Sequence, residues 1–357
     1  MASSIAAITT GTGGVVTTAS GTDGILNLLS GATTIATVAS TGLSTPATIN
    51  VPNTFGFKNR IINGAMQIDQ RNAGAAQTIT AAAALAYTVD RWYAYSTGAN
   101  VTGQQIAGTY ASSQNRYQFT GAASVTAIGF GQRIEAKNCY DLANTTATLS
   151  CYISNSLLTT VTWTAYYATT TADTFGSLAS PTVTSIATGT FTVTSSRAQY
   201  TASISVPSAA TTGIQILFTV GAQTSGTWII DTVQFEGGAV ATSYDYRSIG
   251  IELALCQRYY EILGVNNASA RSFFVDIYAN SLNVPSLAML WRFSVTKRAA
   301  ATVATIGTFN TSNISGAVAI DGTPSFDSAT LSANPAGAGR AYFFNNANSG
   351  FYASSEL

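Results

Sequence analysis

From residue 87 to residue 236, the chain is a succession of short segments rich in β-branched and aromatic residues, separated by Gly, Ser, Thr and Pro. Segments of this length between turn residues are typical of β-strands, and helical periodicity is almost absent. We predict strands at residues 87–96, 116–120, 131–136, 147–154, 161–168, 191–195, 198–206, 213–220 and 228–236. Regularly spaced short strands of this kind predict an antiparallel β-sandwich.

Charge is scarce in this chain and histidine is absent. Charged residues make up 8% of the 357 residues, about a third of the usual share. The lack of histidine excludes Ser–His and Cys–His catalysis and His-ligated zinc chemistry. The formal net charge is zero and no basic run occurs, so we expect no nucleic-acid partner. Because 46% of the residues are hydrophobic, the low charge does not predict disorder. It does fit extensive burial between chains.

Neither membrane insertion nor disulfide chemistry is expected. No stretch reaches the ~18 unbroken apolar residues of a membrane span, and the start, Met1-Ala-Ser-Ser, lacks the basic residues of a signal peptide. We therefore expect a soluble protein made in a cytoplasm. Cys139, Cys151 and Cys256 show no metal-binding or redox spacing. They are predicted to be small buried side chains, with at least one thiol free unless chains are cross-linked.

Residues 1–56 form a separate segment of unusual composition. Asp23 is the only charged residue before Lys58, and glycines divide the segment into short apolar stretches. Two interpretations stay open. The segment is either a disordered linker, or a set of β-strands in a fibre shaft that neighbouring chains complete, because a lone strand cannot bury its own apolar side.

The sequence predicts one helix, at residues 248–264. Ser248 is a suitable N-cap, Gly264 would end the helix, and the apolar side chains that recur at helical spacing are Ile251, Leu255, Tyr259 and Ile262. A narrow apolar stripe needs a partner, which would be the sandwich or the same helix of two neighbouring chains. We predict that this stripe is a seam between chains of an oligomer.

Residues 265–357 return to a strand pattern and predict a C-terminal β domain, with strands near 273–278, 287–295, 302–309, 318–320 and 341–344.

Two sequence blocks resemble a known protein class. The first runs from Gln234-Phe-Glu-Gly-Gly to Tyr244-Asp-Tyr-Arg247 and continues into Glu252-Leu-Ala-Leu-Cys-Gln-Arg-Tyr-Tyr260. The second is Asn59-Arg-Ile-Ile-Asn-Gly-Ala-Met-Gln-Ile-Asp-Gln-Arg71, followed by Tyr87-Thr-Val-Asp-Arg-Trp92. They resemble the strands that close and open a jelly-roll module in bacteriophage fibre and tail proteins. A third run, Gly21 to Thr34, resembles shaft segments of phage fibres.

This resemblance implies an all-β chain with four parts. They are an N-terminal shaft or virion-attachment segment (1–56), a jelly roll of carbohydrate-binding-module type (57–247), a connecting helix (248–264) and a C-terminal β domain (265–357). It also implies a virion protein. The partners that it implies are two further copies in a homotrimer, other phage virion proteins at the N-terminus, and a bacterial surface glycan.

Asp231 is the carboxylate that we expect to be buried. Under strict alternation it shares one strand face with Ile229, Val233 and Phe235. A buried carboxylate needs an arginine, several N–H donors or a cation. In the modules that the chain resembles, the aspartate of an Ile-Asp-x-Val motif is a calcium ligand, which makes Asp231 and Asp69 calcium candidates. We favour an ion pair of Asp231 with Arg60, Arg71 or Arg91, and predict no metal or other cofactor.

Tyrosines are the candidate sugar-binding residues, because aromatic faces stack on pyranose rings. Tyr93 and Tyr95 share one face of their strand, and Tyr166 lies on another strand. These three are predicted to bind glycan, whereas Trp92 and Trp163 are assigned to the sandwich core.

Three functions follow from these observations. The favoured one is a non-enzymatic phage fibre that contacts the bacterial surface for host attachment. The alternative is a capsid decoration or head fibre with a structural role only. A polysaccharide depolymerase is disfavoured, because glycoside hydrolysis needs paired carboxylates and the sequence shows neither a carboxylate cluster nor a long β-helix repeat.

Overall fold

A computed structural model describes residues 26–30, 33–39, 42–44, 57–81, 84–264, 273–279, 287–345 and 349–357. The chain forms two compact units, Met1–Thr54 and Phe55–Leu357. Most of the segment predicted as linker or shaft lies outside the described residues. The predicted boundaries within the second unit stay predictions.

The described backbone of the first unit is a small antiparallel sheet. Its strands β1 (Leu26–Ser30), β2 (Thr33–Ala39) and β3 (Gly42–Ser44) pair in chain order. Strand structure in these ranges agrees with the β interpretation of the segment.

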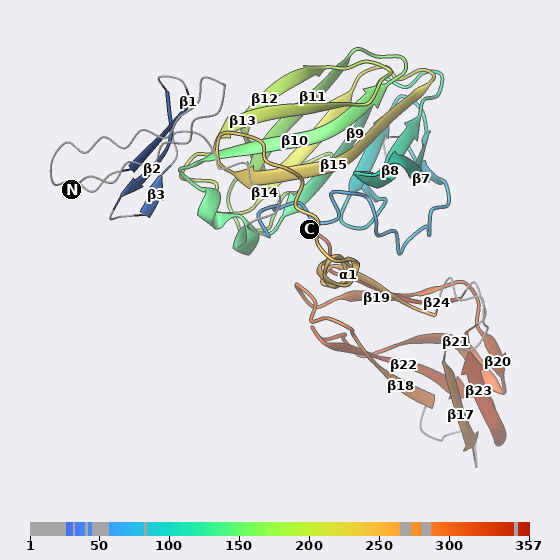
Figure 1. Ribbon diagram of the computed structural model, residues 1–357. Helices are drawn as coiled ribbons and strands as arrows, with labels where there is room; N and C mark the ends of the chain where they lie inside the picture. The colour runs from blue at the N-terminus through green and yellow to red at the C-terminus, as the bar shows by residue number, and fades with distance from the viewer. Residues whose placement is uncertain are drawn as a thin grey trace. The chain divides into compact units, whose positions relative to one another are not determined.

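The second unit begins with two six-stranded antiparallel sheets that face each other as a sandwich (Figure 1). The first sheet has the order β13-β10-β15-β8-β7-β4 and the second the order β12-β11-β14-β9-β6-β5. The first sheet consists of β4 (Gln77–Ile79), β7 (Val101–Tyr110), β8 (Ser113–Thr120), β10 (Thr146–Asn155), β13 (Ala198–Ser205) and β15 (Thr227–Gly237). The second consists of β5 (Ala86–Tyr87), β6 (Tyr93–Thr97), β9 (Ala127–Ile134), β11 (Thr160–Ala168), β12 (Val183–Thr192) and β14 (Ile214–Val220).

The core of the sandwich lies between these sheets. Trp92 and Trp163 are 0% and 7% exposed, which confirms their assignment to the core. Trp92 stacks on Phe130 with ring centroids 4.6 Å apart. The predicted all-β fold with an antiparallel jelly-roll sandwich is confirmed.

A β-bulge in β15 overturns the predicted arrangement around Asp231. The pairing of β10 with β15 shifts between Ser150 and Tyr152, and Thr232 has a positive φ of 51°. The extra residue changes the phase of the alternation. Trp228 and Ile230 therefore belong to the core before the bulge, and Val233 and Phe235 after it. Asp231 does not share the core face with Val233, as strict alternation had predicted.

The helix is shorter than predicted. Helix α1 spans Ile249–Gln257, and residues Tyr260–Leu263 form strand β16, which pairs with β24 (Gly350–Ser354). Strand pairing thus overrides the helical spacing at this point.

Of the four predicted seam residues, Tyr259 and Ile262 lie beyond the helix. Tyr259 is fully buried within its own chain, where its hydroxyl donates to Glu135 Oε2 at 2.9 Å. Ile251 is 42% exposed and Leu255 packs partly buried against a small apolar cluster. The four residues therefore do not lie along one helix, and their contact with a neighbouring chain stays a prediction.

After the sandwich, the described residues of the second unit also form three small sheets (Figure 1). Their orders are β16-β24-β19, β17-β23-β20 and β18-β22-β21. The strands not yet located are β17 (Phe274–Ala279), β18 (Leu287–Arg292), β19 (Thr302–Ile306), β20 (Asn310–Ser312), β21 (Ile314–Asp321), β22 (Ser328–Pro335) and β23 (Gly339–Phe344). All three cysteines are buried and free. Among the described residues, no helix is both long and apolar enough to cross a membrane.

Candidate functional site

The face of the second sheet that points away from the core carries a cavity of about 170 Å³, which we call the tyrosine cavity. Along β6, the core residue Ala94 alternates with Tyr93 and Tyr95, which therefore face the cavity. Neighbouring strands, the residue before β5 and the loop between β11 and β12 supply the rest of the lining. The lining residues are Leu85, Tyr93, Tyr95, Arg133, Tyr166, Phe175, Ser177, Leu178, Pro181, Val183, Gln215 and Leu217.

Two glycines on β9 determine how the tyrosine rings lie. Tyr93 pairs with Gly131 and Tyr95 with Gly129. A Cβ atom at Gly129 would stand 2.1 Å from the Tyr95 ring, and one at Gly131 would stand 2.5 Å from the Tyr93 hydroxyl. The rings thus occupy the space that side chains on β9 would otherwise fill. The glycines allow both rings to extend across β9 toward β14.

Arg133 connects several of the segments that surround the tyrosine cavity. Its Nε donates to Gln215 Oε1 at 3.0 Å, and its two terminal nitrogens donate to the carbonyls of Gly176 (2.8 Å) and Leu357 (2.7 Å). The guanidinium carbon lies 5.4 Å from the Tyr93 ring centroid. A rigid guanidinium fork can position three segments at once. Arg133 therefore fixes β14, the β11–β12 loop and the tail after β24 around one point.

The lining supplies neutral hydrogen-bond donors and one cation. Burial raises the pKa of the Tyr95 hydroxyl, and the neighbouring Tyr166 raises it further. Burial also raises the pKa of Tyr93, although Arg133 opposes this shift. Both hydroxyls therefore stay protonated at neutral pH and can donate. No carboxylate is among the lining residues that the structure describes, so the cavity lacks the pair of acids that hydrolysis of a glycosidic bond uses.

The three tyrosines predicted to bind glycan, Tyr93, Tyr95 and Tyr166, all line this cavity. Tyr93 is 2% exposed and forms part of the floor, whereas Tyr95 and Tyr166 are half-buried. Binding itself stays a prediction. Sequence reasoning missed Arg133 and Gln215, although Gly129, Gly131 and Arg133 alternate along one strand and could have been recognised as one face.

The calcium candidates do not come together. Asp231 accepts two hydrogen bonds from Arg197, at 3.0 Å and 2.6 Å. An ion pair was the favoured interpretation, but its partner is none of the three arginines that we had named. Asp69 closes a turn, since its carboxylate accepts from the backbone N–H groups of Asn72 (3.0 Å) and Gly74 (2.9 Å). Within the described ranges, no group of three or more Cys, Asp or Glu side chains could hold a metal ion.

No family model matches the chain, and neither does any curated protein. Part of the chain is similar to the enzymatically active domain of bacteriophage CBA120 tailspike protein 4, at 16% identity and a TM-score of 0.33 over 51% of this chain and 22% of that one. It is also similar to a CBM4 structure (18% identity, TM-score 0.32, 49% of this chain and 98% of that one). A third similarity is to the CBM22-1 xylan-binding domain of Paenibacillus barcinonensis Xyn10C. Its identity is 11% and its TM-score 0.30, over 51% of this chain and 96% of that one. Identities and TM-scores this low carry no argument about function.

Proposed function

We propose that this protein binds glycans and that the tyrosine cavity is its binding site. The observation that carries the proposal is the meeting of Tyr93, Tyr95 and Tyr166 in one cavity with Arg133 and Gln215. Aromatic faces stack on the apolar faces of sugar rings, and a few fixed polar groups orient the hydroxyls. The cavity provides both kinds of group on a rigid sheet.

Replacing Tyr95 or Tyr166 with alanine should weaken glycan binding about 10-fold, which corresponds to about 1.4 kcal/mol. Each substitution removes a half-buried ring from the cavity, so the melting temperature should change little. Binding would be measured by calorimetric titration with oligosaccharides prepared from bacterial surface polysaccharides. Tyr278→Ala is the matched control, because Tyr278 is 76% exposed on β17 and does not line the cavity. Unchanged affinity in both cavity variants, for every oligosaccharide that binds, would contradict the proposal.

We further propose that the protein is a non-enzymatic component of a phage virion. It would act as a homotrimeric fibre that contacts the bacterial surface for host attachment, with its N-terminal segment joined to other virion proteins. Support comes from the two sequence blocks, the charge-poor N-terminal segment and the cavity lining without carboxylates. The second candidate is a decoration or head fibre with a structural role only, favoured by the same segment composition.

Purified protein should compete with phage particles for host cells and so reduce adsorption, while the Tyr95→Ala variant should compete less. Competition by neither protein would favour the structural role.

Light scattering should give three times the chain mass of 36.9 kDa, and a monomer mass would contradict the trimer. Release of reducing sugar from the surface polysaccharide would contradict the non-enzymatic assignment.

A further inference from the structure

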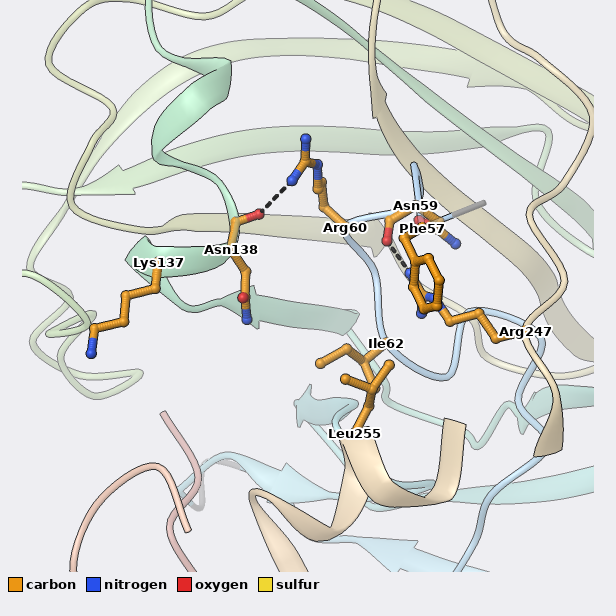
Figure 2. Close-up of a pocket in the computed structure, with 8 residues that line it drawn as sticks. All are labelled: Phe57, Asn59, Arg60, Ile62, Lys137, Asn138, Arg247 and Leu255. Carbon is orange, nitrogen blue, oxygen red and sulfur yellow. Dashed lines mark hydrogen bonds between the residues drawn. The ribbon is translucent and has the colours of Figure 1, made fainter. Parts of the chain in front are cut away.

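A second cavity, of about 180 Å³, is lined by three cationic side chains, Arg60, Lys137 and Arg247 (Figure 2). We call it the basic cavity. The amide side chains of Asn59 and Asn138 also line it, and no carboxylate is among its described lining residues. In a chain with so few charged residues, three cations around one cavity are a marked concentration of positive charge.

Two of these cations have a donor without an acceptor. The Nε–H groups of Arg60 and Arg247 are buried and make no hydrogen bond. The Arg247 side chain is only 7% exposed. Buried donors without a partner are destabilising and rare in native proteins. These Nε–H groups leave the hydrogen bonding of two arginine side chains incomplete where they border the basic cavity.

The other guanidinium nitrogens are already bonded, and this fixes both groups in place. Arg60 donates to Asp141 Oδ2 at 2.6 Å and to the carbonyl of Asn138 at 3.3 Å. Arg247 pairs with Glu252 at 3.2 Å and donates to the carbonyl of Asn59 (Figure 2). Both arginines are therefore preorganised, so little entropy is lost when a ligand binds.

The balance of charge favours an anion. Asp141 offsets Arg60 and Glu252 offsets Arg247. Lys137 is exposed, its side chain points away from the other labelled residues in Figure 2, and it makes no ion pair with any residue that the structure describes. One positive charge among the lining residues of the basic cavity thus remains uncompensated. Lysine is a flexible point charge that can follow a bound anion.

Apolar side chains cover another part of the basic cavity. Phe57 is 65% exposed, and Ile62 and Leu255 lie together in Figure 2. We propose that the basic cavity binds an oxyanion, the carboxylate or phosphate group of a larger ligand, and that these apolar side chains contact the rest of that ligand. Acidic sugars and phosphorylated glycans share this chemistry. The proposal does not depend on glycan binding at the tyrosine cavity.

Calorimetric titration of the full-length protein tests this proposal, with inorganic phosphate, glucuronate and uncharged glucose as probes in chloride buffer at fixed ionic strength. We expect phosphate or glucuronate to bind with a Kd of about 1 mM or below, and glucose not to bind at this site. Binding of one anion alone would identify the source of the oxyanion. Arg60→Gln and Lys137→Gln should each weaken binding about fivefold. Both residues are at least partly exposed, so these variants should keep the fold.

The matched control is Arg292→Gln, because Arg292 is an exposed cation on β18 that forms no ion pair with a described residue. It should bind like the unmodified protein. The proposal is overturned if neither anion shows saturation up to about 20 mM. It is also overturned if Arg60→Gln and Lys137→Gln bind the anion as tightly as Arg292→Gln. Tyr95→Ala should leave anion binding unchanged, which separates this site from the tyrosine cavity.

Discussion

Replacing Glu356 with alanine should lower the free energy of unfolding by about 3–5 kcal/mol, because it leaves buried arginines without their carboxylate. Glu356 pairs with Arg71 at 3.0 Å and also with Arg91. The Arg91 side chain is 1% exposed and lies 3.5 Å from the Tyr259 ring centroid. Arg71 keeps a longer contact of 3.6 Å with Asp90, so the loss falls mainly on Arg91. Urea denaturation would measure the change.

A matched control is available in the C-terminal sheets. Asp276→Ala removes the carboxylate of the pair with Arg340. The Asp276 side chain is 31% exposed and the Arg340 side chain is 61% exposed. Exposed pairs contribute about 0–1 kcal/mol, so this variant should be nearly as stable as the unmodified protein. If Glu356→Ala cost no more than Asp276→Ala, the Arg91–Glu356 pair would not be a determinant of stability.

The same tail reaches the tyrosine cavity. After β24, the backbone N–H of Ser355 donates to the carbonyl of Tyr259 at 2.7 Å. The carbonyl of Leu357 accepts from Tyr87 and from Arg133, each at 2.7 Å. Because Arg133 also holds the cavity wall, the tail connects the C-terminal strands to the floor of the proposed glycan site.

The sequence was sufficient to predict the positions of strands in which apolar residues that face the core alternate with polar ones. β10, β11, β14 and β15 lie within a residue or two of their predicted positions. β7 was missed because its sequence is rich in Gly and Gln, and only its first residues bury side chains. Strands of this kind form because neighbouring strands supply hydrogen-bond partners, which local sequence does not reveal.

The candidate site could be predicted only in part, because the pairing of neighbouring strands is again not visible in the local sequence. Alternation places Tyr93 and Tyr95 on one face of β6, and this could be inferred from the sequence. That Arg133 lies opposite Gln215 depends on the register of β9 with β14, which the hydrophobic pattern alone does not specify. The bulge at Thr232 was equally hidden, and it moved Asp231 from the predicted core face to its contact with Arg197.

Asp231→Ala should also lower the free energy of unfolding by about 3–5 kcal/mol, because it leaves Arg197 buried without its partner. The two side chains are 1% and 8% exposed. The guanidinium carbon of Arg197 lies 3.7 Å from the ring centroid of Tyr152 and 4.6 Å from that of Tyr110. The aromatic rings shield the pair from water, so the charge left behind could not be solvated easily. Urea denaturation again measures the effect.

A double variant and a chelator separate the ion pair from a calcium site. Arg197→Met combined with Asp231→Ala removes both charges, so it should be more stable than Asp231→Ala alone. If Asp231 bound calcium instead, removing Arg197 would not restore stability, and a chelator would lower the melting temperature of the unmodified protein. We expect the chelator to have no effect, because both Asp231 oxygens already accept from Arg197 and Oδ1 also accepts from Thr232 at 2.6 Å. Those bonds occupy the oxygens that a calcium ion would need.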